Sequence, residues 1–274
     1  MTVLRRTWRL FRMFIVLMLG IAIATLMLPL RRSGRVSEHF FMDVASWWHR
    51  RMLGAMGIVV KVDGKIRPQA GIWISNHISW LDILVIGSQA PVHFVSKAEV
   101  RRWPIIGFLA AQTGTLFLKR GANQTGQIVS AMQEKLKDGY AVLFFPEGTT
   151  GHGHYVRRFH SRLFDAAIEL HAPIVPLALR YEHDPQPHPV VPYIDQQSLL
   201  HNLWGVLALK QLHITLIARA PLSAEGAERR RLSEHSREVI CEALALPAPA
   251  LPPDYARASR RAKANANANA NAKQ

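Results

Sequence analysis

The pattern of hydrophobic and polar positions changes once along the chain, near Gly57. Before this point the apolar residues form long runs. After it they form short runs rich in β-branched residues, which alternate with helical stretches. The short runs predict strands at residues 58–62, 71–75, 92–96, 115–118, 141–145, 174–180 and 213–219. The stretches between them predict helices at about 79–89, 104–113, 123–138, 161–171 and 225–245.

This alternation predicts an α/β fold with a mostly parallel central sheet flanked by helices. We place this α/β domain at residues 58–246, and a chain of 274 residues is long enough to bury its core. Residues 247–274 are rich in alanine, proline and asparagine and predict a disordered C-terminal tail. Because ligands of open α/β sheets bind beyond the carboxyl ends of strands, polar residues at those ends are the candidates for chemistry.

Residues 1–57 predict N-terminal membrane-anchoring helices. Residues 13–30 carry no charge, and as a helix about 27 Å long they approach the bilayer hydrocarbon thickness of about 30 Å. Arginines flank both ends, so this run either spans the membrane or enters one leaflet among anionic head groups. A signal peptide or a buried soluble helix fits this pattern less well. Residues 38–57 predict a second helix that contacts the membrane or the core.

The net charge of +15 indicates a partner that is nucleic acid, anionic lipid or a phosphorylated substrate. The basic runs lack the interleaved aromatic residues that base stacking needs, so we expect an anionic membrane surface and no nucleic acid. The single cysteine, Cys241, excludes a disulfide framework and a metal site built from several thiolates. These features fit a membrane-associated protein on the cytoplasmic face of a bacterial inner membrane.

Polar clusters follow several predicted strands, and the first cluster contains a candidate catalytic pair. His77 and Asp82 lie five positions apart in the otherwise apolar stretch ISNHISWLDILVI. Asn76 suits a helix cap, which would put His77 on the turn before a helix that starts near Ser79. Asp82 could then hold one imidazole nitrogen and leave the other as a base. The alternative is a pair of satisfied polar residues at a strand-to-helix junction.

The second and third clusters carry charge next to small residues. GTLFLKR ends in Lys119 and Arg120, which form either a solvated strand end or a phosphate clamp. LFFPEGTTGHG places Glu147 beside glycine and threonine. An acid there suits a hydroxyl-bearing ligand such as glycerol better than a lone phosphate, and the alternative is an ordinary turn.

The remaining features are a proline and a pair of histidines. Pro176 lies inside the predicted strand IVPLALR, where proline is tolerated at a sheet edge or at a bulge. His152 and His154 form a His-x-His pattern that can bind metal. Since no carboxylate lies at a suggestive spacing, we expect a solvated loop there and no metal site.

NHISWLD, GTLFLKR, FPEGTT and IVP, in this order and spacing, resemble the four motif blocks of the 1-acylglycerol-3-phosphate acyltransferase family of glycerolipid acyltransferases. SKAEVRRWPIIG resembles the segment between the first two blocks, and the resemblance covers roughly residues 60–180. It implies transfer of a fatty acyl group from acyl-CoA or acyl carrier protein to the sn-2 hydroxyl of 1-acylglycerol-3-phosphate, a membrane lipid acceptor. It also implies that no cofactor is needed besides this donor.

The resemblance also implies a role for each motif. His77 would take the proton from the acceptor hydroxyl, and Asp82 would orient His77. Arg120 would bind the acceptor phosphate, Glu147 would hold the glycerol, and no acyl-enzyme would form. The implied substrate-binding residues are Asn76, Lys97, Gly114, Phe117, Arg120, Glu147, Gly148, Thr149, Thr150 and Pro176.

One departure from the family pattern concerns the charge of the third block. Many members have arginine where this chain has Thr150, and Arg157 or Arg158 could supply the missing charge. The departure keeps open a different acceptor, such as lyso-ornithine lipid. Two other classes remain as alternatives: a thioesterase, against which the implied acceptor pocket argues, and a basic membrane-binding protein without catalysis.

Overall fold

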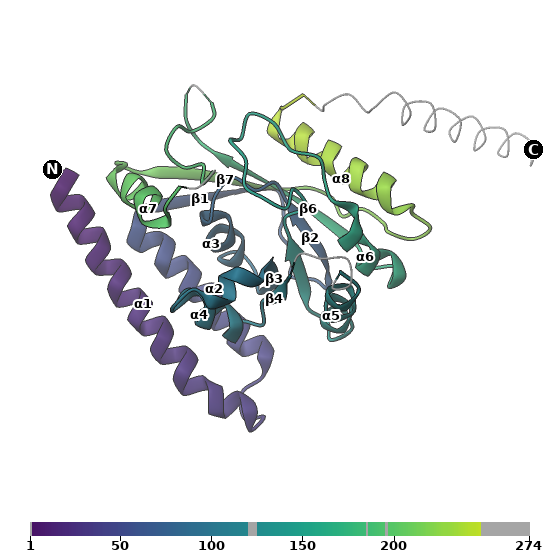
Figure 1. Ribbon diagram of the computed structural model, residues 1–274, viewed down its shortest axis with the longest axis horizontal. Coiled ribbons are helices and arrows are strands. Elements are labelled where there is room, and N and C mark those ends of the chain that lie inside the picture. Colours follow the sequence, from purple (N-terminus) through teal and green to yellow (C-terminus); the bar gives the residue numbers. More distant parts are fainter. Residues whose placement is uncertain (1, 120–124, 185, 195–196, 248–274) are drawn as a thin grey trace, which may run out of the picture.

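A central sheet organises the structure, a computed structural model that describes residues 2–119, 125–184, 186–194 and 197–247. Its strand order is β1-β7-β6-β2-β5-β3-β4 (Figure 1). β6 and β7 pair antiparallel, and the other neighbouring strands pair parallel. The prediction of a mostly parallel sheet flanked by helices is therefore confirmed.

The seven predicted strands are all present, and each end agrees within one residue. The central strands at 71–75, 141–144 and 174–181 are covered on both faces, so continuous apolar runs mark them clearly in the sequence. Their bounds are β1 (Ile58–Asp63), β2 (Gly71–Ser75), β3 (Val92–Lys97), β4 (Leu116–Leu118), β5 (Ala141–Phe144), β6 (Ile174–Tyr181) and β7 (Leu212–Ala218).

The helices differ more from their predicted bounds. The helix expected from about residue 79 begins two residues later, and the one expected at 161–171 is divided into η2 and α6. α7 was not predicted. The helices are α1 (Thr2–Arg32), α2 (Glu38–Met56), α3 (Leu81–Gly87), η1 (Ala98–Arg102), α4 (Ile106–Gln112), α5 (Thr125–Lys137), η2 (Ser161–Phe164), α6 (Asp165–Glu169), α7 (Leu199–Ala208) and α8 (Arg229–Leu244).

Helices cover both faces of the sheet and produce two apolar cores. Successive strand residues point to opposite faces, so Trp73 of β2 enters one core while Ile72 and Ile74 enter the other. The Trp73 core is completed by α2, α3 and α7, and the second core by α5, α6 and α8. The sheet is thus the middle layer of three. The ends of its strands lie between the two helical layers.

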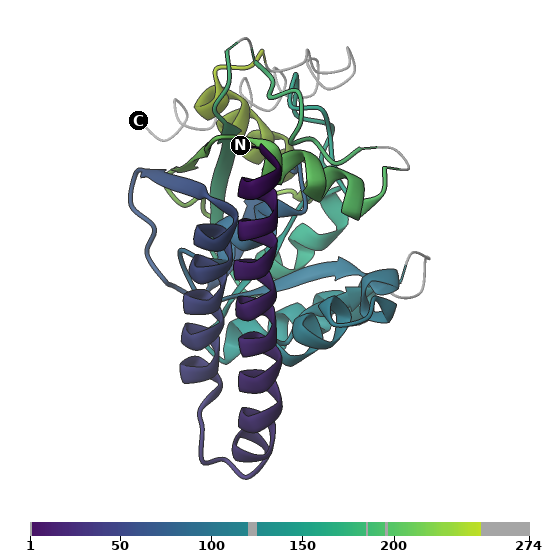
Figure 2. The ribbon, with the colours of Figure 1, turned by 90° about the vertical axis from the view of Figure 1, so that its left-hand side faces the viewer.

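α1 and α2 form a helical hairpin that lies along one side of the sheet (Figure 2). α1 is long and apolar enough to cross a membrane by length and composition. Yet both of its ends bond to the α/β domain. Near its start, Arg9 is buried and donates to the carbonyls of Leu209 and Lys210 at 2.7 and 2.9 Å. Near its end, Arg31 donates to the Gln112 carbonyl at 2.7 Å.

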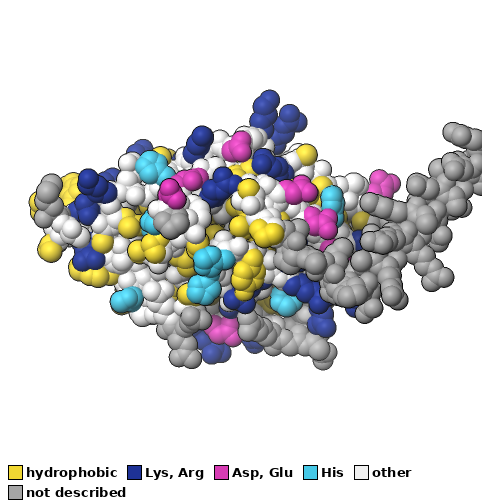
Figure 3. Space-filling model, turned by 90° about the horizontal axis from the view of Figure 1, so that it is seen from above, with side chains coloured by type: hydrophobic (Ala, Val, Ile, Leu, Met, Phe, Trp, Pro, Cys, Tyr) yellow, Lys and Arg dark blue, Asp and Glu magenta, His cyan; other side chains and the backbone are white. Residues whose placement is uncertain are grey.

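The outer side of α1 keeps its apolar side chains exposed. α4 and α7, which α1 contacts, also expose large apolar side chains. Seen from above, hydrophobic and basic side chains lie together at the end of the molecule where α1 begins (Figure 3). Apolar surface beside arginines suits a lipid interface better than water. The exposed residues include Trp8, Phe11, Phe14 and Met18 of α1, Ile106 and Phe108 of α4, and Leu200 and Trp204 of α7.

Pro176 lies in the interior of the sheet, because β6 is paired on both sides. Of the two alternatives, the sheet edge is therefore wrong, and the bulge remains. The β6–β7 ladder starts at Leu177 of β6. The segment that follows β7 then pairs with β6 again through an isolated bridge between Leu222 and Ile174. The Pro176 carbonyl accepts from Arg219 in this interruption, at 3.1 Å.

Candidate active site

The candidate site is built on the turn that follows β2, between β6 and β5. Asn76, the first residue of this turn, is buried, and its side chain bonds both main-chain groups of Leu179 on β6, at 2.8 and 3.0 Å. Its predicted role as a helix cap is wrong, since α3 begins only at Leu81. The amide of Asn76 instead ties the turn to the neighbouring strand.

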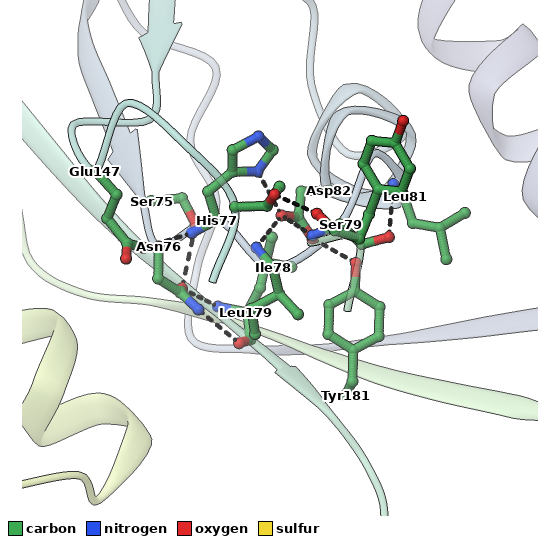
Figure 4. Close-up of polar contacts among 12 residues, drawn as sticks. Ser75, Asn76, His77, Ile78, Ser79, Leu81, Asp82, Glu147, Leu179 and Tyr181 are labelled. Atoms are coloured by element: carbon green, nitrogen blue, oxygen red, sulfur yellow. Dashed lines mark hydrogen bonds and ion pairs between the residues drawn. The ribbon is translucent and has the colours of Figure 1, made fainter. Parts of the chain in front are cut away.

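His77 and Asp82 are directly bonded, as the sequence suggested. His77 Nδ1 lies 2.8 Å from Asp82 Oδ2 (Figure 4). The same oxygen accepts from the amides of Ile78 and Ser79 at 2.7 and 3.0 Å. Tyr181, from the end of β6, donates its hydroxyl to the other oxygen, Oδ1. Four donors therefore fix the orientation of the completely buried Asp82 carboxylate.

The tautomer and the direction of the His77 ring follow from these bonds. An ionised carboxylate can only accept, so Nδ1 carries the hydrogen and Nε2 keeps its lone pair. The ring stacks on Phe145, with centroids 3.9 Å apart and planes 11° from parallel. The His77 side chain is 18% exposed. No described residue bonds Nε2, so this nitrogen can accept a hydrogen bond from a ligand.

Glu147 also bonds the turn that follows β2. Its Oε1 accepts from the His77 amide and its Oε2 from the Arg157 amide, both at 2.8 Å. Burial raises the pKa of this carboxyl to about 7, and the two amide bonds oppose the shift only partly. One carboxyl thus joins the turns after β2 and β5, which are adjacent because these strands pair.

The rest of the third block surrounds this carboxyl. Gly148 adopts a positive φ of 70°, which favours glycine at this turn. The Thr150 hydroxyl donates to the Tyr193 carbonyl, and the Gly151 amide donates to the His77 carbonyl at 2.8 Å. Thr149, which stands between Gly148 and Thr150 in the chain, is half-buried. The threonine that replaces the family arginine is therefore used to hold a neighbouring loop.

The second block lies further along the sheet. Lys97 ends β3, Phe117 lies on the adjacent β4, and Gly114 adopts a φ of 68° just before that strand. The guanidinium of Arg101 lies 5.4 Å from the centre of the Phe117 ring. Arg120, the predicted phosphate contact, lies outside the described residues.

Sequence reasoning missed the side chains that support the pair from a distance. Tyr181 is the last residue of β6, and Phe145, the first residue of FPEGTT, was given no role of its own. Trp80 donates its indole N–H to Asn202 of α7 at 2.9 Å. The signal for Tyr181 was weak, because only the alternation of β6 puts Leu177, Leu179 and Tyr181 on one face.

A recess of about 790 Å³ opens beside the turn that follows β2. Its walls come from the loops after β5 and β6 and from α7, and they include His152, His154, His188 and His201. Both loops are bonded to the turn after β2. The Gly151 amide donates to the His77 carbonyl, and the Tyr193 amide donates to the Ile78 carbonyl at 2.9 Å. Within the described ranges, no group of three or more His, Cys, Asp or Glu side chains is placed to hold a metal ion.

Comparisons with known proteins identify the family. A family model described as Acyltransferase matches residues 58–180. The chain is 38% identical to a lyso-ornithine lipid O-acyltransferase of Pseudomonas aeruginosa, over 72% of this chain and 77% of that protein. It is 31% identical to a 1-acyl-sn-glycerol-3-phosphate acyltransferase of Neisseria meningitidis, over 70% of this chain and 76% of that protein.

The fold also matches a solved structure. The 1-acyl-sn-glycerophosphate acyltransferase PlsC of Thermotoga maritima aligns with a TM-score of 0.60 and 19% identity, over 86% of this chain and 96% of that one. At this identity the likeness shows the fold alone. The family model and the two bacterial relatives show the family: this chain belongs to the acyltransferases that include lyso-ornithine lipid and 1-acyl-sn-glycerol-3-phosphate acyltransferases.

Proposed function

We propose that this protein moves a fatty acyl group from an acyl thioester, acyl-CoA or acyl carrier protein, to the hydroxyl of a membrane lyso-lipid. His77 Nε2 accepts the hydroxyl proton as the acceptor oxygen attacks the thioester carbonyl carbon. The tetrahedral intermediate then breaks its C–S bond, and the leaving thiolate takes the proton from His77. The products are the acylated lipid and the thiol, and the steps need no cofactor besides the donor.

The observation that carries this proposal is the arrangement around His77. The ring is held by Asp82 on one nitrogen and by Phe145 on one face, and the other nitrogen faces outward. A base with a fixed tautomer and a partly exposed lone pair suits proton abstraction from a bound hydroxyl. Direct transfer without an acyl-enzyme is consistent with Cys241, which is buried in the second core.

We favour lyso-ornithine lipid as the acceptor. A relative with this activity in its name has 38% identity over most of both chains. Relatives with the same name in Rhizobium meliloti and Brucella abortus are 40% and 31% identical over 122 and 166 residues. Thr150, which holds the Tyr193 loop, stands where the phosphate-acceptor pattern has arginine.

1-Acylglycerol-3-phosphate is the second candidate acceptor. The Neisseria relative named for this substrate is 31% identical over 76% of its length. Acylation of its sn-2 hydroxyl would give phosphatidic acid for phospholipid synthesis. The same base and the same donor chemistry serve both acceptors, so only the head group distinguishes them.

We further propose that α1 attaches the enzyme to one leaflet, on the cytoplasmic face of a bacterial inner membrane. Both ends of α1 bond to the same α/β domain through Arg9 and Arg31, and its outer side is apolar. A spanning helix would have to put these ends on opposite sides of about 30 Å of hydrocarbon. An anchor of this kind keeps the site at the interface, where a lyso-lipid presents its hydroxyl.

The test is acyl transfer by membranes that contain the protein. One labelled acyl thioester is supplied, with lyso-ornithine lipid and 1-acylglycerol-3-phosphate offered in parallel, and His77→Ala serves as the control. We expect product from the wild type and at least about a 100-fold lower rate for His77→Ala. Membrane attachment, measured by sedimentation, should not change. Equal rates in the two proteins, or hydrolysis without transfer, would refute the proposal.

A further inference from the structure

An unpaired arginine lies next to the carboxyl that supports His77. The main chain of Arg157 is fixed, because its amide donates to Glu147 Oε2 at 2.8 Å. Its side chain is half-buried, and its Nε atom is buried with no hydrogen-bond partner among the described residues. Burying a guanidinium donor without an acceptor is costly. The position is therefore suited to an acceptor that a ligand brings.

Distances from Gly151 locate this side chain relative to the turn that follows β2. A Cβ atom added to Gly151 would lie 3.6 Å from Arg157 Nε, 3.8 Å from Glu147 Oε2 and 3.9 Å from the His77 carbonyl oxygen. The guanidinium thus lies against the same short segment that bonds the His77 main chain. The Arg157 charge is also close enough to Glu147 to oppose the upward shift of its pKa.

The neighbouring helix keeps this segment in place. Arg237 of α8 donates from Nε and Nη2 to the Val156 carbonyl, at 3.1 and 3.0 Å. The Arg157 amide bonds Glu147, so both polar groups of the Val156–Arg157 peptide are held by hydrogen bonds. The direction in which Arg157 leaves the backbone is therefore determined without any bond from its guanidinium.

Arg158 provides a contrast at the next position. Its side chain is exposed, and the charge that it approaches is that of Glu234 on α8. The two arginine side chains thus lie in different surroundings, although the sequence alone offers both as sources of the missing charge. Arg158 is for this reason a matched control for any charge effect of Arg157.

We propose that Arg157 binds the anionic group of the acceptor head group, and so selects lyso-lipids that carry an oxyanion. This rests on the proposed function. A guanidinium matches both carboxylate and phosphate oxygens with paired N–H donors. The oxyanion is the carboxylate of an ornithine head group or the phosphate of a glycerophosphate, and neither needs an arginine at position 150.

The experiment compares Arg157→Gln and Arg157→Lys with Arg158→Gln. Acyl transfer is measured against four acceptors: lyso-ornithine lipid, its carboxyl methyl ester, 1-acylglycerol-3-phosphate and uncharged 1-acylglycerol. Because the Arg157 main-chain bond to Glu147 survives substitution, kcat should change little. We expect Arg157→Gln to raise KM for the anionic acceptor about 10- to 100-fold, Arg157→Lys to raise it less, and Arg158→Gln to leave it within about twofold.

The acceptors identify which oxyanion is bound. If the carboxylate is the ligand, methylation of lyso-ornithine lipid should weaken its use by the wild type but not by Arg157→Gln. If the phosphate is the ligand, the variant should lose its preference for 1-acylglycerol-3-phosphate over 1-acylglycerol. An unchanged KM for every anionic acceptor, or an equal rise in KM for Arg158→Gln, would overturn the proposal.

A binding measurement separates this inference from the proposed function. Wild type and variants in neutral phosphatidylcholine vesicles are titrated with each acceptor, and binding is followed by tryptophan fluorescence. Weaker binding of anionic acceptors to Arg157→Gln supports the inference even if the wild type transfers no acyl group. Normal transfer with unchanged binding in Arg157→Gln would overturn the inference and leave the acyltransferase function intact.

Discussion

The buried carboxyl of Glu147 should make the stability of the protein depend on pH in a predictable direction. Its pKa is raised by burial from an ordinary value of 4.5 to about 7, a difference of about 2.5 units. At about 1.4 kcal/mol per unit, ionising this group in the folded protein costs roughly 3 kcal/mol more than in the unfolded chain. Since Glu147 is only 5% exposed, solvent screens little of this cost.

The sign follows from which state holds the proton more tightly. The folded carboxyl keeps its proton to higher pH than the unfolded one, so the contribution is fully present below pH 4.5 and is lost as pH rises to about 7. The free energy of unfolding should therefore fall by roughly 3 kcal/mol over this window in the wild type. In Glu147→Gln this part of the pH dependence should disappear.

The assay is urea denaturation in detergent micelles at pH 4.5, 6 and 8, followed by tryptophan fluorescence. Glu169→Gln, which replaces an exposed carboxylate on α6, controls for loss of one negative charge and should resemble the wild type. If Glu147→Gln and the wild type lose stability in parallel between pH 4.5 and 8, the buried carboxyl does not titrate in this window. The account of Glu147 as a buried carboxyl that joins the turns after β2 and β5 would then be wrong.

Three other substitutions test the contacts around the site and the anchor. Tyr181→Phe removes the hydroxyl donor to Asp82, so kcat should fall with little change in either KM, and the free energy of unfolding should drop by about 1–3 kcal/mol. Asn76→Ala leaves two buried main-chain groups of Leu179 unpaired, and denaturation should show a loss of about 2 kcal/mol or more. Arg9→Met removes the Arg9 bonds to the Leu209 and Lys210 carbonyls that follow α7, while the bond from Arg5 to Ala208 remains, and limited proteolysis should cleave this region faster than in the wild type.

The central strands β2, β5 and β6 could be predicted well because they are covered on both faces. Buried strands read as short continuous apolar runs, and glycines and prolines mark their ends. α7 could not be predicted in the same way. Asn202 interrupts its apolar pattern, and this side chain is buried because it accepts from Trp80 and donates to the Val190 carbonyl. A tertiary contact, rather than local pattern, explains that asparagine.

Distance along the chain decides how much of the candidate site could be predicted. His77 and Asp82 are five positions apart, so the geometry of one turn is enough to bring them together. Tyr181 and Arg157 lie far from them in sequence and reach the same turn only because β2 is paired with both β6 and β5. The sequence cannot show that strand order. Changes at these distant positions can therefore alter the orientation of the base or the choice of acceptor while the recognisable motifs stay intact.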